Sequence, residues 1–398
     1  MAFKFQGVDF IDFDSLLSED ELLVRTNTRS FIEDKLIPII EQCNRDGRFP
    51  LELARPMGEL GFFGATIDGY GCAGMNNVEA GLLYQELERG DSGIRSFVSV
   101  QSALVMHPIY AFGSDEQKNY WLPKLATGEK LGCFGLTEPD FGSNPSGMRT
   151  RARKDGDDYI LNGEKMWITS GSLADVAIIW AKLEDPGADP NSEPRIRGFL
   201  VETDRPGFSA KDVHGKWSLR ASVTSGLSLQ DVRIPAANLL AKSDGLKSPL
   251  TCLSQARYGI AWGAIGAAMA CYDCALQYAK QRKQFRNQPI ASHQLVQQKL
   301  AWMITEITKA QLLALQVGRL KDQGKAAFQH ISMAKKNNVA MALECARTAR
   351  DILGANGIAD DYPIMRHMMN LESVKTYEGT DDIHTLIIGQ SITGIAAY

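Results

Sequence analysis

The sequence lacks the features of a secreted, membrane-spanning or nucleic-acid-binding protein. Its 43 Lys and Arg residues are scattered among 47 Asp and Glu residues, and a formal net charge of -4 gives no general attraction to a polyanion. The first ten residues have neither the basic region nor the apolar core of a secretory signal. No apolar run approaches the ~20 residues that cross a bilayer. We therefore expect no nucleic acid partner, no membrane insertion, and a location in the bacterial cytoplasm or the mitochondrial matrix.

Paired cysteines and clustered histidines are also missing. Cys271 and Cys274 have the spacing of a redox or metal pair, but no second pair and no histidine cluster accompanies them. The number of cysteines is odd, and five stand in apolar surroundings, as buried reduced thiols do: Cys133, Cys252, Cys271, Cys274 and Cys345. We expect no metal site and no disulfide.

The chain divides into three parts, which predicts an α+β protein. With 398 residues, 44% of them hydrophobic, it can bury the cores of two or three domains. Residues 1–130 have helical periodicity, with capping boxes at Ser18 to Glu21 and Ser114 to Gln117. Residues 131–243 contain short alternating segments, including a hairpin around Asp155 and Gly156. We expect an N-terminal helical domain followed by a middle β-barrel or sandwich domain.

Residues 244–398 return to helical periodicity in long segments. The pattern predicts helices over about 248–282, 293–324 and 329–354, and then a shorter pair. Long amphipathic helices with short connections form bundles, so we expect a C-terminal four-helix bundle.

One carboxylate near the C-terminus stands out. Glu378 lies between Tyr377 and Gly379, where the apolar pattern of one helix stops and that of the next begins. Gly379 removes a side chain that would crowd a ligand approaching the carboxylate. A base is one interpretation of this residue, and a solvated helix end is the other.

The order of motifs along the chain resembles that of the acyl-CoA dehydrogenase family over essentially the whole length. These motifs are the Thr-Glu-Pro loop at 137–139, Trp-Ile-Thr at 167–169, Arg-Lys-Gln-Phe at 282–285, Leu-Gly-Ala-Asn-Gly at 353–357 and Tyr-Glu-Gly-Thr at 377–380. Segments 86–96, 99–102, 104–109, 218–222 and 256–263 resemble the glutaryl-CoA dehydrogenase branch of the family.

This resemblance implies an FAD cofactor held between the middle and C-terminal domains, in a homotetramer. The positions that match the flavin-lining residues are Phe134, Leu136, Thr137, Gly142, Ser143, Trp167, Ile168, Thr169, Thr380 and Asp382. Those that match residues reaching the FAD of a neighbouring subunit are Arg282, Gln284, Phe285, Asp351 and Gly354.

The resemblance also implies a substrate and a mechanism. Glu378 would remove the α proton of glutaryl-CoA while the β hydride passes to the flavin, and loss of CO2 would then give crotonyl-CoA. An electron-transfer flavoprotein would take up the electrons. The positions that match substrate-binding residues are Arg95, Ser96, Glu88, Tyr377, Gly379, Ser143 and Arg257.

The sequence departs from the family pattern near the expected flavin. Arg286 and Asn287 stand where the family commonly has one glycine, which predicts weaker FAD retention. Asn144 replaces an aspartate, Ser170 an asparagine, Lys375 an asparagine and Asp381 a histidine. The charges of Lys375 and Asp381 would move the pKa of Glu378 in opposite directions.

Other functions remain open on the sequence alone. A dehydrogenase for another acid-tailed acyl-CoA, without decarboxylation, would keep Glu378 and Arg95. A flavin oxidase or monooxygenase on the same fold would differ in oxygen access. A flavin-binding protein without activity would be expected to have lost the base.

Overall fold

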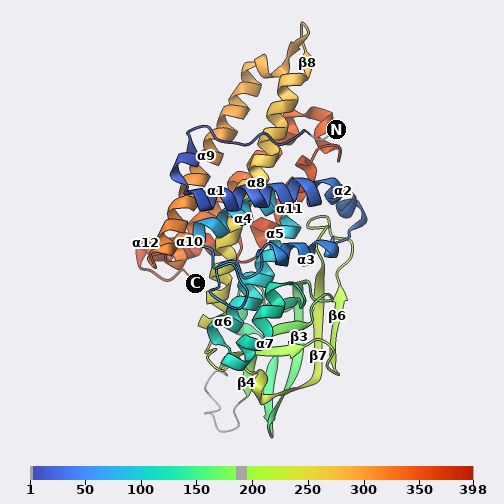
Figure 1. The fold of residues 1–398 in the computed structure, drawn as a ribbon, viewed down its shortest axis with the longest axis vertical. Helices are drawn as coiled ribbons and strands as arrows, with labels where there is room; N and C mark the ends of the chain where they lie inside the picture. Colours follow the sequence, from blue (N-terminus) through green and yellow to red (C-terminus); the bar gives the residue numbers. More distant parts are fainter. Residues whose placement is uncertain (1–2, 185–194, 398) are drawn as a thin grey trace.

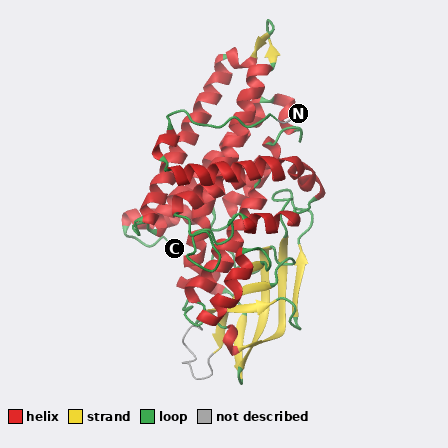
Figure 2. Ribbon diagram, in the orientation of Figure 1, coloured by secondary structure: helices red, strands yellow, loops and turns green. Residues whose placement is uncertain are grey.

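Three groups of elements follow one another along the chain, which confirms the predicted α+β organisation. The computed structural model describes residues 3–184 and 195–397. Helices fill the centre and one end of an elongated molecule, and the strands of the middle part gather at the other end (Figures 1 and 2).

The N-terminal group is helical, as predicted. Both expected capping boxes are present, and a third joins Asn76 to Glu79. Segments Ile32–Leu36 and Val100–Met106 are π-helical. The α-helices described in this part are α1 (Glu19–Phe31), α2 (Ile37–Asp46), α3 (Ala54–Glu59), α4 (Asn77–Gly90), α5 (Ser92–Ser99), α6 (His107–Phe112) and α7 (Asp115–Ala126).

The middle part forms a seven-stranded sheet with strand order β1-β4-β2-β3-β7-β6, in which β5 also pairs with β4. The predicted hairpin is the β2–β3 pair, with Gly156 at a φ of 62° in its turn. The strands are β1 (Gly132–Gly135), β2 (Arg151–Asp155), β3 (Asp158–Thr169), β4 (Val176–Glu184), β5 (Ile196–Glu202), β6 (Phe208–Asp212) and β7 (Thr224–Pro235).

Strand β4 shows how this sheet is attached to the helices. Val176, Ile178 and Trp180 belong to the large core shared with the helical domains. The alternate residues Ala177 and Ile179 belong to a second core that lies within the β domain. Because successive side chains of a strand point to opposite faces, β4 is buried on both sides and fixes the β domain against the helices.

The C-terminal part contains the long predicted helices within one or two residues of their expected ends. They are α8 (Lys247–Gln281), α9 (Gln294–Asp322) and α10 (Phe328–Ile352), followed by α11 (Ile364–Thr376) and α12 (Asp381–Thr393). A hairpin of β8 (Lys283–Gln284) and β9 (Gln288–Pro289) joins α8 to α9.

Helix α8 differs from the amphipathic helix that we expected. It is long and apolar enough to span a membrane by length and composition, so our expectation that no such run exists was wrong. Within the protein 83% of its most apolar window is buried. The helix is apolar on all sides because helices pack around it, as in the core of a large domain.

Glycines bring α4 and α8 unusually close together. A Cβ added at Gly266 would stand 1.8 Å from the backbone oxygen of Gln85, and one added at Gly81 would stand 2.4 Å from the ring of Trp262. One added at Gly263 would stand 2.1 Å from a carboxylate oxygen of Glu88. The absence of side chains on these faces therefore sets the distance between the two helices.

We expect Gly266→Ala to destabilise the protein by about 1–3 kcal/mol, because the methyl group would overlap backbone atoms of α4 that cannot move alone. Thermal and denaturant unfolding would measure the effect. Gly389→Ala on α12 is the matched control, since no atom lies within 4 Å of its added Cβ. Equal unfolding midpoints for the two variants would contradict the close crossing.

Candidate active site

Glu378 lies in the connection between α11 and α12, as the sequence predicts. Its φ is 56°, and that of Gly379 is 92°, so two successive residues adopt left-handed conformations. Thr380 then caps α12, accepting a hydrogen bond from the Ile383 N–H at 3.2 Å. A left-handed conformation costs a residue other than glycine ~1–3 kcal/mol and persists only where its surroundings impose it.

Two buried cations impose this conformation. Arg257 on α8 donates from Nε to the carbonyl oxygen of Glu378 at 2.7 Å. Lys335 on α10 donates to the carbonyl oxygens of Tyr377 at 3.1 Å and Gly379 at 2.8 Å. Each of the three successive carbonyls is therefore held by a cation from another helix.

One oxygen of the Glu378 carboxylate, Oε2, is left available. This atom is buried, and no donor among the described residues reaches it. Burial raises the pKa of Glu378, whereas the charges of Arg257, Lys335 and Arg95 oppose that rise. A carboxylate with a raised pKa and a buried Oε2 that accepts no hydrogen bond has the properties of a general base.

The charges that act on Glu378 differ from those suggested by the sequence. Asp381 forms an ion pair with Lys336 at 3.3 Å, and Lys375 contributes its carbonyl oxygen to Lys335 at 3.4 Å. His384 is buried beside Gly379, and burial lowers its pKa to about 3, so its ring is neutral. The electrostatic environment of the base is therefore set mainly by buried cations.

A second charged cluster lies close to this loop. Arg95 on α5 is 1% exposed and donates from Nε to Glu88 at 2.6 Å and from Nη2 to the Tyr377 hydroxyl. Ser92 donates to the other oxygen of Glu88 at 3.0 Å. Burial raises the pKa of Tyr377, so its hydroxyl stays protonated. The structure thus brings Glu88, Arg95 and Tyr377 close to Glu378. Ser96 directly follows Arg95 on α5 and is also buried.

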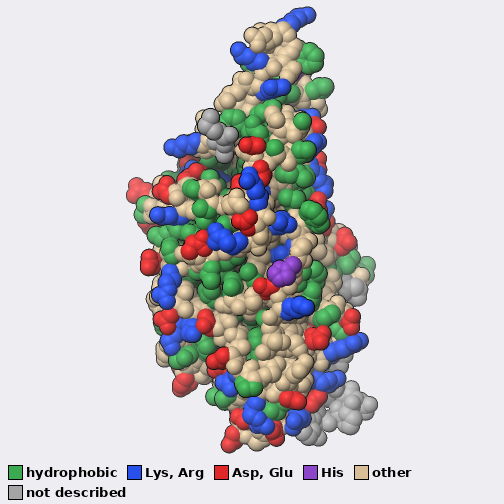
Figure 3. Space-filling model, turned by 90° about the vertical axis from the view of Figure 1, so that its right-hand side faces the viewer, with side chains coloured by type: hydrophobic (Ala, Val, Ile, Leu, Met, Phe, Trp, Pro, Cys, Tyr) green, Lys and Arg blue, Asp and Glu red, His purple; other side chains and the backbone are tan. Residues whose placement is uncertain are grey.

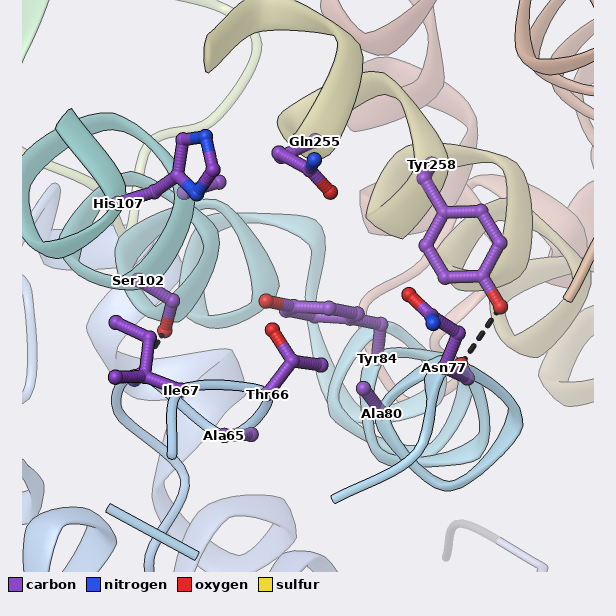
Figure 4. A pocket seen from close by; sticks show the side chains of 12 residues that line it. Ala65, Thr66, Ile67, Asn77, Ala80, Tyr84, Ser102, His107, Gln255 and Tyr258 are labelled. Carbon is purple, nitrogen blue, oxygen red and sulfur yellow. Dashed lines mark hydrogen bonds between the residues drawn. The ribbon is translucent and has the colours of Figure 1, made fainter. Parts of the chain in front are cut away.

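A small pocket lies one helical turn along α4 from Glu88. Tyr84, Thr66 and Ser102 point toward it, with His107 and Gln255 on its other side (Figure 4). None of its lining residues carries a charge, because burial lowers the pKa of His107 to about 4. A carboxylate would find its counter-charge at Arg95 and not in this pocket.

The predicted flavin-lining residues of the β domain lie on β1, on β3 and in the loop between β1 and β2. Phe134, Leu136 and Ile168 are buried, whereas Trp167 is 60% exposed at a φ of 63°. Thr137 and Thr169 are partly exposed, and Gly142 and Ser143 are exposed in the loop. An aromatic ring exposed next to a buried strand is free to pack against a ligand.

A buried ion pair that we did not predict supports this surface. Lys165 donates to Glu138 at 2.9 Å and to the Leu136 carbonyl at 3.1 Å. Glu138 also accepts hydrogen bonds from the backbone of Arg149 and Thr150. The pair therefore ties together the two ends of the 137–149 loop.

The remaining predicted flavin residues lie elsewhere in the chain. Arg282, Gln284 and Phe285 are in the β8–β9 hairpin at the tip of the molecule, far from the sheet (Figure 1). Phe285 is 81% exposed, and Asp351 forms an ion pair with Lys299 near the end of α10, before Gly354. One chain therefore does not bring these residues to Glu378, and their role at a neighbouring subunit remains a prediction.

No metal centre accompanies the site in the part of the chain that the structure describes: no group of three or more His, Cys, Asp or Glu residues is placed to hold a metal ion. The seven cysteines are free, and all except Cys72 are buried.

Charges of both signs are interspersed over the face shown in Figure 3.

Sequence reasoning missed Lys335, whose position carried a usable signal. It stands four residues after Ile331 and four before Val339, on the buried face of α10. A lysine within an apolar helical stripe needs a buried partner, and here the partners are loop carbonyls.

Comparison with known proteins identifies the family. The N-terminal, middle and C-terminal domain models of acyl-CoA dehydrogenases match residues 18–129, 133–232 and 243–393. A glutaryl-CoA dehydrogenase from Mycobacterium smegmatis is 54% identical, with a TM-score of 0.93 and coverage of 97% of each chain. A second structure from that organism, in complex with FADH2, is 50% identical with a TM-score of 0.95, over 99% of this chain and 100% of the other.

Two structures of lower identity bear on ligands. A glutaryl-CoA dehydrogenase in complex with glutaryl-CoA is 34% identical with a TM-score of 0.90, over 97% of each chain. A chain from a structure of the electron transferring flavoprotein of Acidaminococcus fermentans is 32% identical with a TM-score of 0.90, over 95% of this chain and 98% of the other. The chain belongs to the acyl-CoA dehydrogenase family and is similar to its glutaryl-CoA dehydrogenases.

Proposed function

We propose that this enzyme oxidises glutaryl-CoA and decarboxylates the product to crotonyl-CoA and CO2. The observation that carries the proposal is the buried Arg95, held by Glu88 and Tyr377 close to the Glu378 loop. A plain fatty acyl chain gives no reason to bury an arginine here, whereas an acid-tailed chain does. The similarity to solved glutaryl-CoA dehydrogenases supports the same substrate.

FAD is the cofactor of the family, and the residues present fit it. The residues that would hold it are the exposed Trp167 and the exposed loop at Gly142 and Ser143 on the β domain, with Thr380 and Asp382 at the start of α12. The Arg282 to Phe285 hairpin, with Asp351 and Gly354, would complete the site in a neighbouring subunit of a homotetramer. When bound, FAD supplies the hydride acceptor for the β carbon of the substrate.

The protein supplies the base and its surroundings. Glu378 takes the proton from the carbon next to the thioester, and the Glu378 backbone N–H donates to the thioester oxygen. Such a donor stabilises a developing oxyanion by ~3–4 kcal/mol. Burial of the site excludes water that would compete for the same atoms.

Decarboxylation follows from the same arrangement. After oxidation the distal carboxylate stands one carbon beyond a conjugated double bond, so breaking the carbon–carbon bond releases CO2 and leaves its electron pair in a dienolate. Glu378, now carrying the proton, returns it to this dienolate and gives crotonyl-CoA. A single acid–base residue therefore serves both halves of the reaction.

A dehydrogenase that acts on an acid-tailed acyl-CoA without decarboxylation is the second candidate, because Arg95 would serve it equally well. A flavin oxidase or monooxygenase is the third. Incubation of the FAD-bound protein with glutaryl-CoA and a dye acceptor, with and without air, separates the three candidates. Mass spectrometry then distinguishes crotonyl-CoA from glutaconyl-CoA, and acceptor-independent turnover in air reveals an oxidase.

We propose an electron-transfer flavoprotein as the natural acceptor, which is supported by the similarity to a chain from such a structure. The free, mostly buried cysteines suit a reducing compartment, either the bacterial cytoplasm or the mitochondrial matrix.

We expect Glu378→Gln to retain FAD and to bind acyl-CoA but to lose flavin reduction by ~10²–10⁴-fold, because the amide keeps the shape and cannot accept the proton. Stopped-flow bleaching of the flavin measures the step. Since burial raises the Glu378 pKa, the acid limb of the wild-type profile should lie above the ordinary range of a glutamate. A wild-type rate in the variant would remove Glu378 from the mechanism.

We expect Arg95→Met to impair glutaryl-CoA oxidation by ~3–5 kcal/mol, the cost of breaking a buried ion pair. Butyryl-CoA has no charged tail to strand and should be spared. The ratio of kcat/KM for the two substrates is the measurement.

Arg95→Met alone also strands the buried Glu88. The control is therefore the double variant Arg95→Met with Glu88→Gln, in which no unpaired charge remains. If that variant loses both substrates equally, Arg95 is structural and the glutaryl assignment loses its main support.

We expect replacement of Arg286 and Asn287 by one glycine to strengthen FAD retention. Phe285, Arg286 and Asn287 have φ values of 40°, 59° and 60°, so three residues other than glycine occupy the left-handed region in succession. Titration of the apoprotein with FAD measures the effect. Asn287→Gly is the matched control, because it relieves strain without shortening the turn; unchanged or weaker affinity in the shortened variant would contradict the prediction.

A further inference from the structure

Lys335 is a buried lysine whose ammonium group faces the loop that carries Glu378. Its side chain comes from α10 and is 1% exposed. Its three N–H groups can donate to the carbonyl oxygens of Gly379 at 2.8 Å, Tyr377 at 3.1 Å and Lys375 at 3.4 Å. The number of donors therefore equals the number of acceptors.

These carbonyls are ones that the backbone leaves without helical partners. Lys375 lies in the last turn of α11, where carbonyl groups have no intrahelical donor and carry the negative end of the helix dipole. Tyr377 and Gly379 flank the left-handed Glu378. A cation at this position therefore provides hydrogen bonds for a free carbonyl at the end of α11. It also binds the carbonyl oxygens on both sides of the strained Glu378.

The charge of Lys335 acts on Glu378 without bonding to its Oε2. The carboxylate Oε2 has no hydrogen-bond donor among the described residues, although the Lys335 charge opposes the rise in its pKa. A direct salt bridge would hold the carboxylate away from a substrate and weaken it as a base. Binding the ammonium to backbone oxygens keeps the counter-charge close and the carboxylate available.

We propose that Lys335 is a positioning residue for the acid–base step: it fixes the Glu378 loop in its left-handed conformation and supplies the counter-charge that keeps the carboxylate ionised. The proposal rests on the proposed role of Glu378 as the base. It does not depend on which acyl-CoA is the substrate.

The groups that act on Lys335 come from several elements. Glu378 and Asp381 favour its charged form, whereas Arg257 on α8 and Arg95 on α5 oppose it, and Lys336 is paired with Asp381. Burial is the largest influence and lowers the pKa of Lys335 to about 7. The lysine is therefore charged below about pH 7 and loses its proton as the pH rises through that value.

Lys335→Met tests the proposal, because it keeps an unbranched side chain that is one atom shorter and removes both the charge and the donors. We expect kcat for flavin reduction to fall by ~10–100-fold, as for a small misplacement of a reacting group, with a smaller change in KM. The acid limb of the kcat profile should move up by about one pH unit, since Glu378 loses an opposing charge. FAD content and melting temperature are measured in parallel.

The surface variant Lys309→Met is the matched control. Lys309 lies on α9 and pairs with Glu306 at 2.8 Å, so its replacement removes one lysine charge without touching the loop. Its kcat and acid limb should equal those of the wild type. A Lys335→Met variant with the kcat and acid limb of the wild type would overturn the proposal.

Lys335→Arg separates the charge from the hydrogen bonds. A guanidinium keeps the charge, but its planar fork cannot direct three donors at these carbonyls. We expect the Lys335→Arg variant to have a lowered kcat and an acid limb at the same pH as that of the wild type. If its acid limb is displaced as far as that of Lys335→Met, Lys335 does not act on Glu378 through its charge. If the methionine variant does not fold, the arginine variant decides alone: an unchanged kcat overturns the positioning role.

The proposed function can fail separately. If the wild type does not reduce its flavin with glutaryl-CoA, the substrate assignment fails, and the Lys335 variants are then compared with the wild type on butyryl-CoA.

Discussion

The arrangement of the site depends on one constraint: the Glu378 carboxylate must be shielded from water, yet remain ionised and open to a ligand. Burial raises the pKa of Glu378, and a direct salt bridge would occupy its carboxylate. Here Arg257 Nε and the Lys335 ammonium group bind the backbone oxygens of residues 377–379, and the charges of both side chains act on the carboxylate. The same contacts impose the left-handed conformation at Glu378. Electrostatics and geometry of the base are therefore set by one group of hydrogen bonds that joins α8, α10 and the α11–α12 connection.

The distal end of the site depends on a different constraint, the absence of side chains on α8. Glu88 lies against Gly263, where a Cβ would stand 2.1 Å from its carboxylate oxygen and 3.1 Å from Arg95 Nε. Any larger residue would therefore displace the ion pair from its position between α4 and α8. The close crossing of these helices and the position of the Glu88–Arg95 ion pair thus both depend on small residues on α8. An enzyme with a bulkier residue here would have to place its arginine elsewhere.

Much of this architecture could be predicted from the sequence because local signals agree with the fold. Ser18 and Ser114 mark helix starts, the continuous apolar run at the start of β4 is typical of a strand buried on both faces, and Glu378 falls between two periodic segments. Lys335 and the Lys165–Glu138 pair could not be predicted with the same ease. Their partners are distant in sequence, and a backbone carbonyl leaves no mark in the side-chain pattern. The sequence also led us to expect an amphipathic α8. This helix is buried on all sides and therefore lacks the amphipathic pattern of a surface helix.

The donors of Arg95 show how an acid tail could be accommodated in a site already balanced in charge. Of five N–H groups, one is directed at Glu88 and one at the Tyr377 hydroxyl oxygen. Because Tyr377 accepts from Arg95 and stays protonated, its own O–H can donate to a substrate carboxylate beside the remaining guanidinium donors. Glu88 meanwhile neutralises Arg95 before substrate arrives, which lowers the cost of burying the cation in the free enzyme. In the proposed complex the substrate carboxylate would add one negative charge close to Glu378. The charges of Arg257 and Lys335 would then matter more to Glu378 in the complex than in the free enzyme.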